Sequence, residues 1–365
     1  MKIKAAVSPQ TGKPFEIQEV DLEEPRPNEV LVRIVGTGLC HTDLLFKDHM
    51  PIPLPAVWGH EGAGIVEKTG EAVTSVKPGD PVAISYNSCG KCNNCMCGMP
   101  YYCLNFIGLN YSGARLDGTM PISKDGSPVF GMFFGQSSFA EFSLTTERNI
   151  VKAPPDVPVE LLGPLGCGVQ TGAGTVLNAL RVQAGSSIAV FGTGAVGLSA
   201  VMMARAVGCT CIIGVDIKEE RLKAAQELGA THVINPKEKN PVEQIQAITG
   251  MGVDYSIETT AVPSVYRQAL ESLNMTGECV LLGAPPLGTE VTFDMQSFLT
   301  GKKTRGVIEG DSIPQIIIPQ LLDLYKQGKF PFDKMITYYD AKDINQAVED
   351  SEKGVAIKPV IRFDH

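Results

Sequence analysis

The stretch that decides the fold is SIAVFGTGAVGLSAVMMA, residues 187–204. A β-branched run leads into the glycine turn GTGAVG at residues 192–197, and small or apolar residues with helix propensity follow it. This order predicts a buried strand, a tight turn and the start of a helix. The run is long and uncharged enough for a membrane helix to be considered, but its three central glycines make that the weaker interpretation.

Toward the C-terminus, short β-branched runs alternate with helical patterns such as 218–228 and 241–249. This alternation is typical of a parallel sheet with crossover helices. Six strands are expected, near 187–191, 211–215, 232–235, 253–258, 278–283 and 304–308. We therefore predict an α/β fold with a Rossmann, doubly wound, six-stranded parallel sheet.

Toward the N-terminus, the chain is rich in Gly and Pro, and alternating segments such as EVLVRIV at residues 29–35 indicate irregular antiparallel β structure. This part is expected to form a separate domain. Near the C-terminus, a helix is expected over 319–327 and a strand over 356–363.

Composition excludes several classes of protein. With 365 residues, 44% of them hydrophobic, two domains with real cores are expected rather than disorder. A net charge of −9 gives no basic surface for nucleic acid or anionic lipid. The first residues lack the pattern of a secretory signal, so the cytoplasm is the expected location.

Cysteines cluster in one Gly/Asn-rich segment, where Cys89, Cys92, Cys95 and Cys103 are spaced C-x2-C-x2-C-x7-C. Four thiolates so close in sequence can converge tetrahedrally on a zinc ion of structural type. An iron–sulfur cluster and unligated thiols are the alternatives. Cys97 lies in the same stretch and is either a free thiol or a misassigned ligand.

The glycine turn is placed to bind a dinucleotide, because it follows a strand and opens a helix whose N-terminus can face pyrophosphate. Asp216 ends the next strand, where a carboxylate can bind both ribose hydroxyls. This favours NAD over NADP, although Lys218 keeps dual use open. A solvated helix cap is the structural alternative for Asp216.

Three scattered residues form a second candidate metal set: Cys40 in GLCHTD, His60 in WGHEGAG and Cys167 in GPLGCG. Two thiolates and one imidazole leave a coordination position open, as a catalytic zinc site requires. Taken singly each residue is weak evidence, since buried cysteines and satisfied core histidines are commoner. Spacing alone does not unite them.

Taken together, these motifs resemble the zinc-containing medium-chain alcohol dehydrogenases over essentially the whole chain. Within that family, GLCHTDL, GHEGAG, FFGQSSFAEF, ELLGPLGCGVQTGAG and GKFPFDK are similar to bacterial benzyl (aryl) alcohol and geraniol dehydrogenases. The resemblance implies a GroES-like catalytic domain over 1–168 with a zinc lobe at about 86–106, a Rossmann NAD domain over 169–308, a return to the catalytic domain over 309–365, and a cleft between the domains.

The resemblance also implies roles for individual residues. Cys40, His60 and Cys167 match the catalytic zinc ligands, and the clustered cysteines match the structural set, giving two zinc ions per subunit. The matched catalytic positions are Thr42 on the alcohol, Glu61 beside the zinc, Asp43 orienting His60, and His41. The matched coenzyme positions include the turn residues Gly192, Gly194 and Gly197, and Asp216 at the ribose. Others lie around the nicotinamide (Thr171, Val196 and Leu282), near the adenosine ribose (Arg221) and at the pyrophosphate (His41 and Lys358).

One position departs from the family pattern. Leu45 stands where known members place the histidine that passes the proton to solvent. His41 is the nearby histidine that could replace it, and a His41→Gln variant with an unchanged pH–rate profile would exclude that role.

The implied function is reversible NAD-linked oxidation of a primary aromatic or allylic alcohol by a homo-oligomer, a dimer or tetramer. Rivals are a dehydrogenase for aliphatic alcohols or S-(hydroxymethyl)glutathione, and a non-catalytic nucleotide-binding relative. Aromatic residues could line the substrate pocket, although aromatics more often belong to the core. They are Trp58, Phe106, Phe133, Phe134 and Phe139.

Overall fold

The structure, a computed structural model, describes residues 1–363. Within them the chain folds into two compact units. The first holds Met1–Cys167, Ile313–Pro319 and the segment from Met335 onward, and the second holds Gly168–Ser312 and Gln320–Lys334. The expected domain limits 1–168, 169–308 and 309–365 stay a prediction, and residues 364–365 of the last range lie outside the described part.

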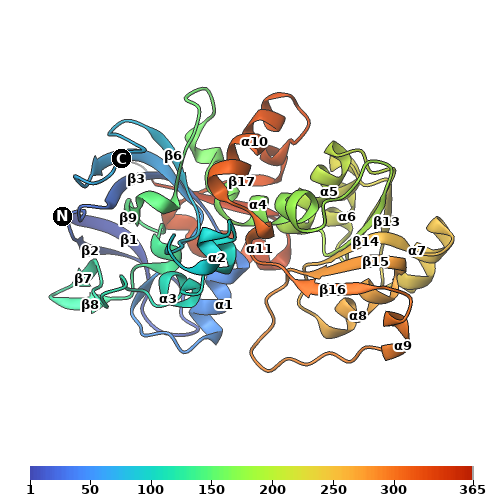
Figure 1. The fold of residues 1–365 in the computed structure, drawn as a ribbon. Coiled ribbons are helices and arrows are strands. Elements are labelled where there is room, and N and C mark those ends of the chain that lie inside the picture. The colour runs from blue at the N-terminus through green and yellow to red at the C-terminus, as the bar shows by residue number, and fades with distance from the viewer. Residues whose placement is uncertain (364–365) are drawn as a thin grey trace. The chain divides into compact units, whose positions relative to one another are not determined.

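The second unit is built on a parallel sheet in the order β13-β12-β11-β14-β15-β16 (Figure 1). Its strands are β11 (Ser187–Phe191), β12 (Cys211–Val215), β13 (His232–Ile234), β14 (Val253–Glu258), β15 (Leu273–Leu281) and β16 (Lys303–Gly306). The strand order reverses between β11 and β14, as it does in doubly wound folds. The predicted α/β fold with a six-stranded parallel sheet is confirmed.

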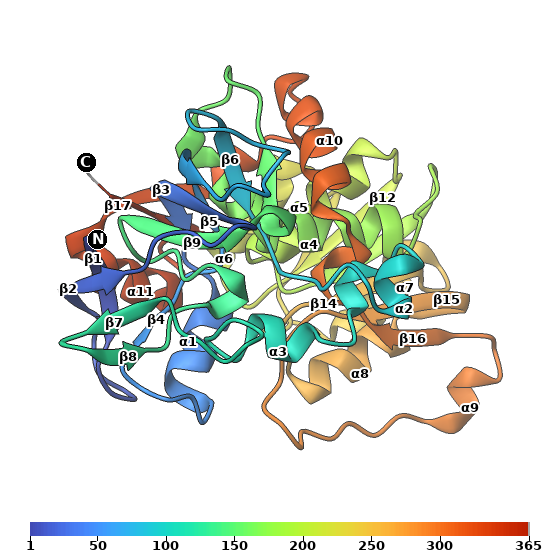
Figure 2. The same ribbon diagram turned by 60° about the vertical axis from the view of Figure 1, so that its left-hand side comes forward.

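Helices connect these strands, as the sequence pattern predicts. They are α5 (Ala195–Ala206), α6 (Glu219–Leu228), α7 (Pro241–Thr249) and α8 (Pro263–Glu271). Helix α5 contacts α6, and α7 contacts α8, so the helices pair in layers against the sheet. Two short helices complete this unit, α4 (Gly168–Gly174) and α9 (Met295–Phe298), and Figure 2 shows the long extended segment that leads from β15 to α9.

Some predicted limits differ from the observed ones. Strand β15 begins at Leu273 rather than near residue 278, because a register shift interrupts its pairing with β14 and hides the strand pattern. Strand β16 ends at Gly306, since the chain turns through positive φ angles at 309–311. The predicted helix over 319–327 is α10 (Pro314–Lys326), which starts earlier and contains Pro319. Its buried residues Ile317, Ile318, Leu321 and Leu322 form one continuous face.

The first unit contains two mainly antiparallel sheets, as predicted for an irregular β domain. One has the order β4-β1-β2-β7-β8, with β1 (Lys2–Ser8), β2 (Glu16–Leu22), β4 (Ala56–Val57), β7 (Ile122–Lys124) and β8 (Ser127–Val129). The other runs β10-β6-β5-β3-β18-β17, and β9 also pairs with β3. Its strands are β3 (Glu29–Gly38), β5 (Gly62–Thr69), β6 (Pro81–Ile84), β9 (Phe142–Thr146), β10 (Ile150–Lys152), β17 (Ile336–Asp340) and β18 (Lys358–Arg362).

The C-terminal part joins this second sheet. Strand β18 pairs antiparallel with β3, with Ile361 opposite Thr37, and parallel with β17. Helix α11 (Ile344–Lys353) packs on β18. The expected strand near 356–363 is therefore present, and it lies beside the N-terminal strands.

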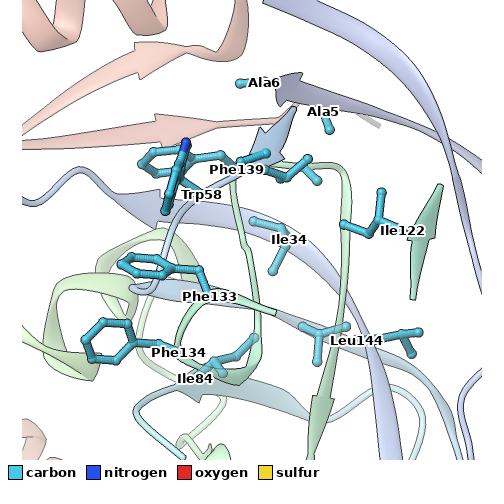
Figure 3. Packing of buried hydrophobic residues seen from close by; sticks show 14 of the residues in the cluster. Ala5, Ala6, Ile34, Trp58, Ile84, Ile122, Phe133, Phe134, Phe139 and Leu144 are labelled. Carbon is cyan, nitrogen blue, oxygen red and sulfur yellow. The ribbon is translucent and has the colours of Figure 1, made fainter. Parts of the chain in front are cut away.

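The core of the first unit combines aliphatic residues such as Ile34 and Leu144 with a group of aromatic rings (Figure 3). Trp58, Phe133 and Phe139 have no exposed surface, and Phe134 and Phe106 are also buried. Rings meet edge to face, for example Trp58 and Phe133 at 5.0 Å between centroids. The burial of all five aromatic side chains agrees with the core interpretation of these residues.

The stretch between β6 and β7 contains the short helices α2 (Asn93–Met96) and α3 (Phe106–Asn110) and exposes several apolar side chains, among them Ile107. Helix α1 (His41–His49) follows β3. In the described part of the chain, no helix has the length and apolar character needed to cross a membrane.

Candidate metal and coenzyme sites

The four clustered cysteines converge in the segment between β6 and β7. The sulfur atoms of Cys89, Cys92, Cys95 and Cys103 all lie within 4.8 Å of one another. Backbone amides point at them: the Cys92 N–H donates to the Cys89 sulfur, and the Cys89 N–H donates to the Cys103 sulfur, both at 3.3 Å. Cys97 is exposed and is not a member of this group.

The pKa values of these thiols indicate what the cluster can bind. Burial, helped by the neighbouring Cys92, raises the pKa of Cys95 to about 12. Burial also opposes ionisation of Cys89, yet the N–H groups of Lys91 and Cys92 lower its pKa to about 6. Four thiolates this close repel one another, so all four ionise together only around a cation. The donor set fits a tetrahedral zinc ion.

The scattered residues also converge, although they come from distant parts of the chain. Donor atoms of Cys40, His60, Glu61 and Cys167 lie within 4.8 Å of one another. Cys40 precedes α1, His60 and Glu61 precede β5, and Cys167 precedes α4. The bend before Cys167 needs glycine, since a Cβ on Gly166 would lie 2.1 Å from the Ile84 carbonyl oxygen.

Asp43 joins two of these segments from the first turn of α1. One carboxylate oxygen, Oδ2, accepts a hydrogen bond from the Cys40 N–H at 3.0 Å. The other, Oδ1, lies 2.8 Å from His60 Nδ1 and accepts from the Gly59 N–H at 3.1 Å. With Nδ1 facing a carboxylate, the His60 tautomer that leaves Nε2 free for a metal is favoured.

Two further residues, Gln136 and Phe134, hold His60, a role that was not predicted for them from the sequence. The Gln136 amide donates to the His60 carbonyl at 2.8 Å and accepts from the Gly62 N–H at 2.9 Å. The Phe134 ring stacks on the imidazole, with centroids 4.5 Å apart. Phe134 has a φ of +51°, a strained value for a bulky residue. Both belong to FFGQSSFAEF, and that strain is visible only in the structure.

Lys358 lies against this cluster. Its ammonium group is buried and ion-paired with Glu61 at 2.5 Å, and it also donates to the Leu39 carbonyl at 3.2 Å. Burial lowers the pKa of Lys358, but Glu61 and Cys40 outweigh it and raise that pKa. Burial raises the pKa of the Glu61 carboxyl, which Lys358 opposes. The predicted role of Lys358 at a coenzyme phosphate stays a prediction, and in the structure its ammonium group contacts Glu61.

The buried polar atoms of the scattered cluster fit a divalent cation. His60 Nε2 is buried and makes no hydrogen bond to any of the described residues. Contact with Cys167, against the effect of burial, holds the pKa of the Cys40 thiol well below its usual value. A thiolate next to an imidazole nitrogen that needs a partner is the donor chemistry that zinc prefers.

The glycine turn has the geometry needed for close approach of a phosphate. Gly192 has a φ of +88°, and a Cβ on Gly197 would lie 1.9 Å from the Gly192 carbonyl oxygen, so α5 starts directly against the turn. The N-cap of α5 is Gly194, which has no side chain to cover the helix end. The turn therefore leaves backbone amides accessible to an anion.

Asp216 lies at the end of β12 and holds the turn. Its carboxylate accepts from the Thr193 N–H at 2.7 Å and from the Lys218 N–H at 3.0 Å, and it is mostly buried. The Arg221 guanidinium lies 3.9 Å from the same carboxylate. The expected ribose carboxylate and the expected basic residue are thus neighbours.

The remaining expected residues lie as follows. The Thr42 hydroxyl oxygen is 3.7 Å from the Cys40 sulfur, and His41 is exposed at the start of α1. Thr171 lies in α4, with its hydroxyl 3.5 Å from Glu309, and Leu282 directly follows β15. Val196 lies in the first turn of α5.

Comparison with known proteins identifies the family. The family model described as zinc-binding dehydrogenase matches residues 195–327, and the alcohol dehydrogenase GroES-like domain matches residues 26–155. A geraniol dehydrogenase from Castellaniella defragrans is 46% identical over 363 residues, which is 99% of this chain and 97% of the relative. The chain belongs to the zinc-dependent medium-chain alcohol dehydrogenases.

Solved structures of this family agree. The benzyl alcohol dehydrogenase of Acinetobacter calcoaceticus is 48% identical with a TM-score of 0.97, and an alcohol dehydrogenase zinc-binding domain protein from Burkholderia ambifaria is 50% identical with a TM-score of 0.98. Both comparisons cover all of each chain. The predicted family, its GroES-like part and zinc as a cofactor of this alcohol dehydrogenase are therefore confirmed.

Proposed function

We propose that this zinc alcohol dehydrogenase uses NAD to oxidise primary aromatic or allylic alcohols reversibly to aldehydes. The observation that carries the proposal is the convergence of Cys40, His60 and Cys167 within 4.8 Å. Three protein ligands of this kind leave a zinc ion open to an exchangeable fourth ligand. The substrate class is supported by the similarity to geraniol and benzyl alcohol dehydrogenases.

In this proposal the two clusters have different roles. Cys40, His60 and Cys167 hold a catalytic zinc with Glu61 beside it, whereas Cys89, Cys92, Cys95 and Cys103 hold a structural one. When bound at the open set, zinc supplies a Lewis acid that makes the alcohol hydroxyl more acidic.

The chain's own residues then orient the reaction. Asp43 keeps His60 in the tautomer whose Nε2 faces the ligand set. The Thr42 hydroxyl, next to the Cys40 sulfur, takes the proton of the alcohol as it passes its own proton on toward His41. His41 is exposed at the adjoining position and releases that proton to water, in place of the histidine replaced by Leu45.

The coenzyme is assigned to the second unit, where NAD supplies the hydride acceptor. The turn residues Gly192, Gly194 and Gly197 present backbone amides to pyrophosphate. Asp216 binds the ribose hydroxyls with Arg221 nearby, which favours NAD over NADP. We assign Thr171, Val196 and Leu282 to the nicotinamide half, and His41 and Lys358 to the pyrophosphate.

A kinetic panel tests the proposal. Benzyl, cinnamyl, geranyl and ethyl alcohols are compared with NAD and with NADP on the zinc-loaded enzyme. We expect kcat/KM for the aromatic or allylic alcohols to exceed that for ethanol by about tenfold or more, because a ring or chain adds apolar contact. We expect NAD to be preferred over NADP. A preference for ethanol or for NADP would contradict the respective part of the proposal.

We also infer that the enzyme is a cytoplasmic homo-oligomer, a dimer or tetramer. None of the ten cysteines forms a disulfide in the described part of the chain, and the exposed Cys97 suits a reducing compartment. Exposed apolar residues on the lobe, including Met96, Leu104 and Ile107, suit burial against another copy. Light scattering of the purified protein gives the subunit number, and a monomer would contradict this inference.

A further inference from the structure

A buried carboxylate closes the C-terminal end of β14. Glu258 is the last residue of that strand and has no exposed surface. Its side chain accepts hydrogen bonds from the Thr260 N–H at 2.5 Å, from the Thr260 hydroxyl, and from the Ala261 N–H at 3.1 Å. Three donors converge on one carboxylate, which holds residues 259–261 in a fixed turn.

This turn packs against Gly192, the first glycine of the turn at residues 192–197. The Thr259 hydroxyl lies 3.0 Å from both the Phe191 and the Gly192 carbonyl oxygens, and the Thr259 N–H donates to the Phe191 carbonyl at 3.0 Å. A Cβ on Gly192 would lie 2.3 Å from the Thr259 hydroxyl oxygen. The position of Gly192 therefore depends on where the turn holds Thr259.

The same turn fixes the end of β15 on its other side. The Leu282 N–H donates to the Glu258 carbonyl at 2.8 Å. A Cβ on Gly283 would lie 2.3 Å from the Ala261 nitrogen, and Ala261 itself has a φ of +61°. Such a strained backbone conformation persists only when the surrounding structure holds it. Here the Ala261 N–H donates to the Glu258 carboxylate, which helps to hold it.

The turn occupies the point where the strand order reverses. Strand β14 lies between β11 and β15, and the reversal falls between β11 and β14. In sheets of this kind, ligands bind outside the carboxyl ends of the strands at that point. The turn that the Glu258 carboxylate holds, and that contacts the ends of β11 and β15, therefore lies at the edge where such a sheet binds its ligand.

We propose that Glu258 is a positioning residue for the dinucleotide, acting through Thr259 on Gly192 and through Ala261 on the end of β15. This inference rests on the proposed use of a nicotinamide coenzyme. A glutamine at the same place directs an NH2 group at one of the three donors, so it cannot accept all of the bonds. The turn then loosens on both sides, and the coenzyme loses a preformed site.

The other end of β14 offers a matched control. Asp254 accepts hydrogen bonds from the Ser187 N–H, the Ser187 hydroxyl and the Asn274 amide, each at 2.8 Å. Its carboxylate accepts as many bonds as that of Glu258, but it links β14 directly to β11 and β15, and it does so at the N-terminal ends of these strands. A purely structural role for such a carboxylate predicts equal effects at the two positions.

The experiment compares Glu258→Gln with Asp254→Asn in the full zinc-loaded chain. NADH binding is measured by fluorescence titration without alcohol, and the melting temperature is measured without coenzyme. We expect Glu258→Gln to raise the NADH Kd about tenfold or more, since a buried donor loses its partner in the coenzyme site. Both variants should lower the melting temperature, because each leaves a hydrogen-bond donor without its acceptor, but Asp254→Asn should leave the NADH Kd unchanged.

An unchanged Kd in Glu258→Gln, or an equal rise in both variants, would overturn the inference. If Glu258→Gln fails to fold, Thr259→Val removes only the hydroxyl bonds to Phe191 and Gly192, and about a threefold rise in Kd is expected. An unchanged Kd in that variant would also overturn the inference. A wild-type chain that bound neither NADH nor NADPH would instead overturn the proposed coenzyme use itself, and this inference with it.

Discussion

The two cysteine-containing clusters are built in opposite ways. The ligands of the lobe cluster all come from residues 89–103, and backbone N–H groups of the same loop surround their sulfurs. The ligands of the scattered cluster come from segments near residues 40, 60 and 167. The first cluster needs only its own loop, whereas the second exists only when the sheets of the first unit are formed.

Their surroundings differ in the same sense. Cys89, Cys92 and Cys95 are partly exposed, and a metal ion there would hold together a lobe made of short helices. The scattered donors are backed by Asp43, Gln136, Phe134 and Lys358. Side chains that position a metal ligand or set its charge are typical of a catalytic metal site, whereas a shell of backbone amides is sufficient for a structural ion. The clusters should therefore fail differently when they are damaged.

The largest expected effect comes from breaking the scattered cluster. Replacing His60 with Ala removes a nitrogen donor that packs between Asp43 and Phe134. Because a Lewis acid contributes several kcal/mol of transition-state stabilisation, we expect turnover of benzyl alcohol to fall about a thousandfold or more. Initial rates measure the fall in turnover, and metal analysis should show that the variant has lost one zinc ion per chain.

NADH binding measured by fluorescence serves as the control for the His60→Ala variant. The glycine turn and Asp216, to which we assign most of the coenzyme contacts, belong to the second unit, so the Kd should stay close to that of the wild type. Full activity in this variant, or loss of both zinc ions, would remove the distinction between the clusters.

Breaking the lobe cluster should damage stability before activity. In a Cys103→Ser variant the remaining three thiols cannot complete a tetrahedral site. We expect the lobe to lose several kcal/mol of stability, because structural zinc binding contributes directly to folding free energy. Proteolytic nicking between residues 86 and 106 and the melting temperature report the change.

Cys97→Ser is the matched control for the lobe, since this cysteine lies in the same segment but is exposed and outside the group. It should melt and resist proteases like the wild type. If Cys97→Ser and Cys103→Ser behaved alike, the assignment of the four ligands would be wrong.

The same contrast explains what the sequence can predict. The ligand spacing of the lobe is local, so C-x2-C-x2-C-x7-C predicts the cluster without knowledge of the fold. The glycine turn and the strands that follow it are equally local, and the sheet has the six parallel strands that were predicted. The predicted start of β15, near residue 278, was wrong, because irregular pairing at 273–278 breaks the period-two pattern.

The scattered cluster could be assembled only through a family resemblance, because its members are separated by whole sheets. Its supports were harder still to foresee. The stacking of Phe134 on His60 depends on a positive φ, and the pairing of Lys358 with Glu61 depends on β18 lying beside β3. Such contacts arise from tertiary packing, which composition and periodicity do not encode.

The smallest of the three effects concerns the support of the scattered cluster rather than its ligands. Asp43→Asn keeps the shape of the side chain but removes its charge and one acceptor, so His60 Nδ1 and the N–H groups of Cys40 and Gly59 are no longer all satisfied. Changing a residue of this kind typically weakens metal binding about 10- to 100-fold, and we expect a loss within that range. Transfer of zinc to a chelator, followed in time, measures it.

This measurement also separates the two clusters within one molecule. Asp43→Asn should accelerate the release of one zinc and leave the other at the wild-type rate, because the lobe cysteines are held by their own backbone. Asp48→Asn, on the same helix but bonded to Lys47 and the Gly12 N–H, should change neither rate. Acceleration of both releases in Asp43→Asn would mean that the lobe depends on the scattered cluster, and that the two are not built independently.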